Sequence, residues 1–189
     1  MIFGSRKDFM RLSAFAVLGI VIILNTSCAG PSPAPAAVAE YRTTATVKEV
    51  MGSVVNPNAE FIWKSVESTT GDGGAKEKAP STDAEWADLR RHAIALREAT
   101  DLLQIPGRKM AGAGEKAKDE SEQSPEAMQA MMEKDRAKWV QFSHGLHDTV
   151  TEVIKAIDAK SVSGVLEAGG SIDGACESCH QVFWYPEKK

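Results

Sequence analysis

Residues 162–183 have the sequence VSGVLEAGGSIDGACESCHQVF, and the spacing within this stretch decides the fold. Apolar or small residues recur there at alternating intervals of three and four, at Val162, Val165, Gly169, Ile172, Cys176, Cys179 and Phe183. This period is typical of an α-helix with one side packed on a core. The sequence therefore predicts that both cysteines lie on the core-facing side of the last helix.

The same stretch contains Cys176-Glu177-Ser178-Cys179-His180, which has the spacing of a c-type haem attachment motif. Residues three apart on a helix lie one above the other, so both thiols can reach the two vinyl groups on one porphyrin edge. His180 would then be held against the iron as an axial ligand. We expect one covalent haem c, with thioether bonds to Cys176 and Cys179.

Three other interpretations of the cysteine pair stay open on these residues alone. A thioredoxin-like redox pair needs a βαβ setting with the motif at the start of a helix, and no strand is evident here. A zinc site needs a second pair of ligands, for which His144 and His147 are the candidates. A chance occurrence is possible for so short a motif.

Upstream of this helix, three more amphipathic segments are expected, giving an all-α, antiparallel four-helix bundle. They cover about 42–68, 82–105 and 124–157, with loops at 69–81 and 105–123. Pro57 should kink or split the first, because proline lacks a backbone donor and clashes with the preceding turn. Thr82 with Glu85 forms a capping box, and Ser124 with Pro125 forms a second helix start. The third segment is expected to be one long helix.

The N-terminal residues 1–27 are typical of a secretion signal, with Arg6, Lys7 and Arg11 before a short apolar run. Residues 24–28, Leu-Asn-Thr-Ser-Cys, resemble a lipoprotein processing site at which Cys28 is acylated, although Asn25 departs from the usual pattern. Cleavage near residues 37–39 is the alternative. Residues 28–40 form a Pro/Ala-rich tether, and residues 41–189 form the helical domain. We therefore expect a periplasmic protein held at the membrane by lipid on Cys28.

The net charge of the chain indicates which kinds of macromolecule it can bind. The whole chain has a net charge of −4, and without residues 1–27 it keeps 19 basic against 25 acidic side chains, a net charge of −6. No basic stripe is available to neutralise phosphates, so a nucleic-acid partner is not expected. An acidic surface favours docking to a basic patch on a redox partner protein.

The helix pattern together with the motif resembles the class II c-type cytochromes, the family of cytochrome c′ and its low-spin relatives. The resemblance covers residues 42–185 in the number and order of helices and in the position of the motif on the last one. Phe183 matches the aromatic that follows the histidine, whereas Trp184 and Tyr185 stand where a basic residue is usual. The resemblance implies a haem four-helix bundle, often paired as a homodimer. It also implies a methionine of the first helix as second iron ligand, here Met51, although methionine is also a common core filler.

The function expected from these features is one-electron transfer by a mono-haem cytochrome, and not enzymatic catalysis. The alternative is a five-coordinate haem that binds or senses nitric oxide or carbon monoxide. A peroxidase is the weakest interpretation, since no histidine and arginine pair lies near Met51. Of the remaining histidines, His147 should flank the buried stripe of its helix, while His144 and His92 should face water.

Overall fold

The computed structural model describes residues 41–71 and 74–185. The predicted signal segment, the acylation site Cys28 and the tether up to residue 40 lie outside these residues. Within the described ranges, no helix is long and apolar enough to cross a membrane.

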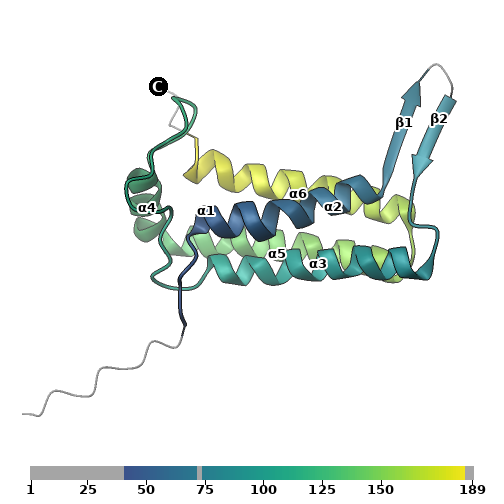
Figure 1. Ribbon diagram of the computed structural model, residues 1–189, viewed down its shortest axis with the longest axis horizontal. Coiled ribbons are helices and arrows are strands. Elements are labelled where there is room, and N and C mark those ends of the chain that lie inside the picture. The colour runs from purple at the N-terminus through teal and green to yellow at the C-terminus, as the bar shows by residue number, and fades with distance from the viewer. Residues whose placement is uncertain (1–40, 72–73, 186–189) are drawn as a thin grey trace, which may run out of the picture. The chain divides into compact units, whose positions relative to one another are not determined.

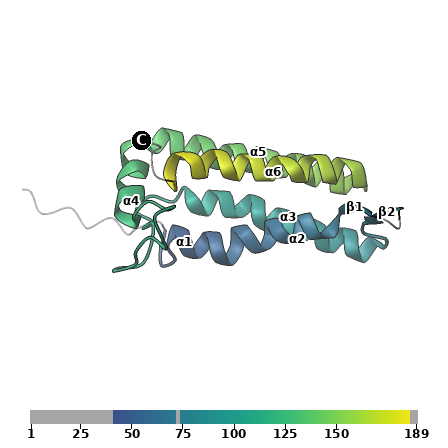
Figure 2. The same cartoon turned by 90° about the horizontal axis from the view of Figure 1, so that it is seen from above.

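Four long helical stretches pack side by side and antiparallel (Figures 1 and 2). The first is composite, with α1 (Val47–Val50), a π-helical turn η1 (Met51–Val55) and α2 (Asn56–Ser65) in one run. The other three are α3 (Asp83–Leu103), α5 (Arg136–Asp158) and α6 (Val162–Phe183). Neighbours in the bundle are α2 with α3, α3 with α5, α5 with α6, and α6 with α2, so the ring of contacts is closed. The expected four-helix bundle is confirmed.

The core consists of the predicted apolar stripes. Apolar residues that recur at three-and-four spacing are buried in two of the helices: Trp86, Leu89, Ala93, Leu96 and Leu103 in α3, and Trp139, Leu146, Val150, Val153 and Ile157 in α5. The stripe of α6 faces inward as well, with Val165, Ile172 and Phe183 buried. Capping boxes begin α1 at Thr46 and α3 at Thr82, and the latter is the predicted one.

Of the two outcomes expected at Pro57, a kink or a split, the split does not occur, since the helical run continues through the proline. The helix changes type ahead of the proline: Asn56 donates its backbone N–H to the oxygen of Met51, five residues back, in a π turn. An interior proline conflicts with the carbonyl four residues before it, and a turn widened by one residue relieves that conflict. As a consequence, Met51 begins the widened turn.

A β-hairpin connects the first helix to α3, so the expectation that the chain lacks strands is wrong. β1 (Glu67–Gly71) pairs antiparallel with β2 (Gly74–Lys78), and the pairing runs from Glu67 opposite Lys78 to Gly71 opposite Gly74. The strands carry no apolar alternation that a hydropathy pattern could detect. The sequence signal that could have revealed them is the pair of adjacent threonines, Thr69 and Thr70, followed by the glycine-rich stretch Gly-Asp-Gly-Gly.

The predicted third helix is two helices. α4 (Pro125–Lys134) begins at Ser124 and Pro125, as predicted, but the helix ends at Asp135. Asp135 has a non-helical backbone (φ −126°, ψ 63°), and its side chain accepts a hydrogen bond from the Lys138 N–H at 3.0 Å. This residue therefore caps a new helix, and α4 lies across the end of the bundle (Figure 1).

Candidate cofactor site

A cavity of about 600 Å³ lies at the end of the bundle where the first helix begins and α6 ends. Its size falls within the range of about 300–1,000 Å³ typical of cofactor sites. Its walls come from the first helix, the end of α3, the segment before α4, the start of α5 and the last turns of α6. Antiparallel packing explains this meeting, because it puts the start of the first helix beside the end of the last. Met51, Cys176, Cys179 and His180 all line this one cavity.

Cys176 and Cys179 are half-buried on the inner side of α6, and neither forms a disulfide. Burial raises the pKa of Cys176 to about 11, with a smaller contribution from Asp173. Burial also raises the pKa of Cys179 to about 12, with a smaller contribution from Cys176. Both groups are therefore neutral thiols at neutral pH. A thioredoxin-like pair depends on a thiolate of lowered pKa, and this site lacks one.

His180 is half-buried beside the two thiols. Burial lowers the pKa of its imidazole, an effect that Glu177 partly offsets. The ring makes edge contacts with Trp184 and Tyr185, with centroids 4.7 and 6.3 Å apart. The neutral imidazole favoured here is the form that binds a metal ion.

Met51 lies on the wall that belongs to the first helix and is partly buried against the core. The structure thus brings the predicted second ligand into the cavity that holds the cysteines and His180. Two methionines that sequence reasoning passed over, Met110 and Met128, line the same cavity. They come from the segment after α3 and from α4. The apolar spacing of the third segment includes Met128 but does not mark it as part of the site.

Aromatic rings form the inner end of the cavity. Phe183 packs edge-on against Trp139, with ring centroids 5.2 Å apart, and against Phe142 at 6.1 Å. The indole N–H of Trp139 donates to the backbone oxygen of Leu103 at 2.9 Å. All three rings line the cavity, so this wall is apolar and its one buried polar group is satisfied.

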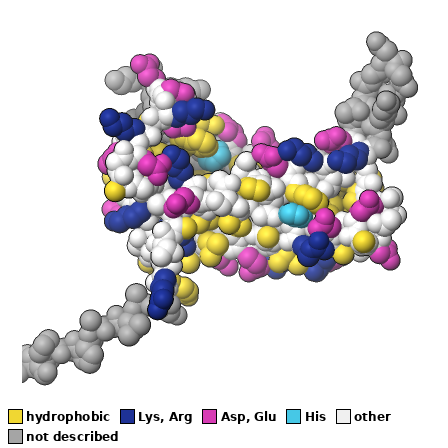
Figure 3. Space-filling view, in the orientation of Figure 1, with side chains coloured by type: hydrophobic (Ala, Val, Ile, Leu, Met, Phe, Trp, Pro, Cys, Tyr) yellow, Lys and Arg dark blue, Asp and Glu magenta, His cyan; other side chains and the backbone are white. Residues whose placement is uncertain are grey.

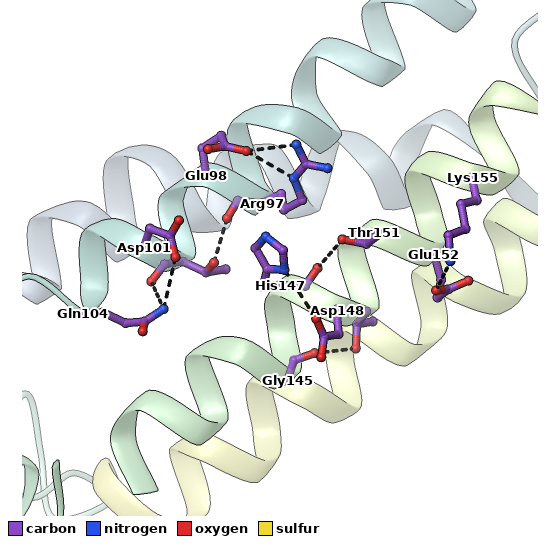
Figure 4. Close-up of polar contacts among 12 residues, drawn as sticks. Arg97, Glu98, Asp101, Gln104, Gly145, His147, Asp148, Thr151, Glu152 and Lys155 are labelled. Atoms are coloured by element: carbon purple, nitrogen blue, oxygen red, sulfur yellow. Dashed lines mark hydrogen bonds and ion pairs between the residues drawn. The ribbon is translucent and has the colours of Figure 1, made fainter. Parts of the chain in front are cut away.

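The other histidines lie away from the cavity. His144 is exposed, and His147 is half-buried, as predicted. Figure 4 shows His147 on α5 beside Asp148, whose carboxylate is 3.4 Å from the ring nitrogen. His92 was expected to face water, but its side chain is only 34% exposed and its ring stacks on Phe61 at 3.7 Å.

The zinc interpretation of the cysteine pair finds no support. Within residues 41–71 and 74–185, no three histidine, cysteine or acidic side chains gather in a way that could hold a metal ion. A structural zinc site needs four such ligands.

Comparison with known proteins gives matches to solved structures alone. No family model matches the chain, and no curated protein matches it. Among solved structures, the chain is similar to a cytochrome c′, with 16% identity and a TM-score of 0.47 over 74% of this chain and 98% of that one. It is also similar to a ferrous variant of cytochrome c prime from Alcaligenes xylosoxidans with bound NO, with 16% identity and a TM-score of 0.47 over 76% and 98%. A nitric oxide complex of a mutant of that protein gives 16% identity and a TM-score of 0.46 over the same shares.

Proposed function

We propose that this chain is a mono-haem c-type cytochrome of the class II kind. The observation that carries the proposal is the meeting of Met51 with Cys176, Cys179 and His180 in one cavity. The residues present fit a porphyrin in three respects: the cavity has the volume of a cofactor site, its inner end is aromatic, and its thiols and imidazole have the spacing of the attachment motif.

In this proposal each residue has a defined task. Cys176 and Cys179 hold the porphyrin edge covalently, and the neutral His180 imidazole binds the iron from the side of α6. Met51 supplies a thioether from the first helix as the second axial ligand. Haem bound in this way supplies an iron that cycles between two oxidation states, and a thioether ligand raises its potential.

Hydrogen bonds attach the segment before α4 to two other walls of the cavity. The N–H of Gln123 donates to the oxygen of Trp184 at 2.8 Å, and its side-chain amide donates to the oxygen of Tyr185 at 2.9 Å. On the other side, the N–H of Val47 donates to the oxygen of Lys109 at 2.8 Å. The segment before α4 is thus attached both to the end of α6 and to the start of the first helix. Such a cover limits the access of water, which is one of the factors that set a haem potential.

With His180 and Met51 both bound to iron, the function is one-electron transfer between partner proteins. Apart from His180, no histidine or arginine lies among the described residues that line the cavity. Histidine is the side chain that most often moves protons in acid–base catalysis of this kind. We therefore propose an electron carrier and not an enzyme. Export, lipid on Cys28 and pairing into a homodimer stay predictions from the sequence and the resemblance.

A second candidate function is the binding of a gas at the iron position that Met51 would otherwise occupy. Besides Met51, the first helix contributes aliphatic side chains to the cavity, among them the buried Val47, Val55 and Ala59. If the Met51 sulfur stays off the iron, the sixth position faces these apolar groups and can bind a small uncharged gas. Nitric oxide or carbon monoxide would then be the ligand.

An absorption spectrum of protein matured in a host that attaches c-type haem distinguishes the two functions. Electron transfer with Met51 bound predicts sharp low-spin bands, and in the ferric form a weak thioether-to-iron band near the red end. Gas binding predicts a high-spin spectrum that changes when carbon monoxide is added to the reduced protein. A colourless product would contradict both.

A further inference from the structure

The charged residues that line the cavity are divided between its two sides. Asp173 and Glu177 belong to α6, the helix of the attachment motif. Lys48 belongs to α1, and Lys116 belongs to the segment between α3 and α4. These two lysines are the only lysine or arginine side chains among the described residues that line the cavity. In Figure 3, basic and acidic side chains together surround an apolar patch with a histidine at this end of the bundle.

The two lysines differ in their partners. Lys48 forms an ion pair with Glu115, whose carboxylate also accepts the Gly112 N–H at 2.8 Å. Lys116 forms no ion pair within the described part of the chain. Glu122 is the one other acidic residue on this side of the cavity, and its carboxylate accepts the backbone N–H of Lys118 at 2.8 Å. Lys116 is therefore the cation beside the cavity whose charge is not already balanced by a neighbouring acid.

The covalent attachment fixes which porphyrin edge faces these lysines. In haem, the vinyl groups and the two propionate carboxylates lie on opposite edges of the ring. Thioether bonds to Cys176 and Cys179 would hold the vinyl edge beside α6 and leave the carboxylates on the side away from it. A carboxylate that is partly removed from water is stabilised by a nearby cation, and Lys116 is an exposed cation at the cavity.

We infer that Lys116 is the principal counter-charge for the haem propionates, with Lys48 as a second cation that Glu115 already engages. This inference rests on the proposed haem function and adds a residue that positions the cofactor. Lys116 lies on the segment 104–124 and not on a helix of the bundle. In this inference, it is therefore this segment that binds the propionates. Because the cation offsets negative charge near the iron, it also favours the reduced state.

The test compares Lys116→Gln, Lys116→Arg and Lys118→Gln in full-length protein matured with haem. Lys118 is the matched control, because it is an exposed lysine two residues further along the same segment and does not line the cavity. The measurements are haem content per chain and the reduction potential at low and at high salt. We expect Lys116→Gln to lower the potential by more than Lys118→Gln does, Lys116→Arg to restore it, and high salt to shrink the difference.

The inference would be overturned if the Gln variants at 116 and 118 had the same potential while haem content stayed normal. That result would leave the haem function intact. Loss of haem from the unmodified protein would instead contradict the proposed function itself. If Lys116→Gln lowered haem content without moving the potential of the haem that remained, Lys116 would have a structural role and the inference would again be wrong.

Discussion

The indole N–H of Trp63 on α2 donates to the backbone oxygen of Gly169 on α6, at 2.8 Å. This hydrogen bond joins the helix of Met51 to the helix of Cys176 and Cys179. It fixes the spacing of the two walls of the cavity, and Trp63 itself lines that cavity.

Trp63→Phe should therefore lower stability and loosen the site. We expect a loss of about 1 kcal/mol in the free energy of unfolding, the usual contribution of one hydrogen bond, measured by urea denaturation. Trp86→Phe is the control, because the buried Trp86 makes no such side-chain bond in the described structure. Equal losses for the two variants would mean that packing, and not the bond to Gly169, is what Trp63 supplies.

Met51→Leu should remove the second axial ligand while keeping the volume of the side chain. The expected results are loss of the thioether-to-iron band and a lower reduction potential, since thioether ligation raises it. Met110→Leu and Met128→Leu are matched controls from the same cavity. If the band disappeared in one of these and survived in Met51→Leu, the ligand would be the other methionine.

Gly170→Ala should stabilise α6, whereas Gly164→Ala should not. A Cβ at Gly170 meets nothing within 4 Å, so the gain in helix propensity, about 1 kcal/mol, is free of steric cost. A Cβ at Gly164 would lie 3.0 Å from the Ser161 hydroxyl that caps the helix and 3.1 Å from Ala156. Thermal unfolding checks both, and a lower melting temperature for Gly170→Ala would contradict the open position assigned to that residue.

The capping box of α3 should make stability depend on acid pH. Hydrogen bonds from Ser81 and Thr82 lower the pKa of Glu85 to about 2, from its ordinary value of 4.5. Stability from this carboxylate is therefore fully present above pH 4.5 and is lost as the pH falls towards 2. Glu85→Gln should flatten this part of the pH profile in unfolding experiments.

The control for that profile is Glu126→Gln, in the first turn of α4, where the glutamate accepts no hydrogen bond in the described structure. Glu126→Gln should keep the fall in stability between pH 4.5 and 2, whereas Glu85→Gln should lack it because the contribution present above pH 4.5 is already gone. Parallel profiles for both variants and the unmodified protein would show that the Glu85 bonds do not persist in solution.

The parts of the site that could be predicted from the sequence are those fixed by helix periodicity. The alternation of three and four through Cys176 and Cys179 placed both thiols inward, and the resemblance to class II cytochromes pointed to Met51. Periodicity did not reveal that Met110, Met128 and Lys116 belong to the site. They line the cavity because α4 and the segment before it lie across the end of the bundle, and no periodic pattern encodes that placement.

Two local features of the backbone could not be predicted from the sequence pattern either. The π turn before Pro57 and the helix break at Asp135 each depend on one residue whose effect is decided by its surroundings. A proline can end a helix, kink it or follow a widened turn. An aspartate inside an amphipathic stripe can stay on the surface or cap a new helix, as Asp135 does.

The central claim is that Cys176 and Cys179 hold one haem covalently, and intact-mass measurement under denaturing conditions tests it most directly. Protein matured in a host with c-type haem attachment should carry the added mass of one haem, and the double variant Cys176→Ala, Cys179→Ala should not. An unmodified mass for the parent protein, with both thiols free to react with a thiol reagent after unfolding, would contradict the account.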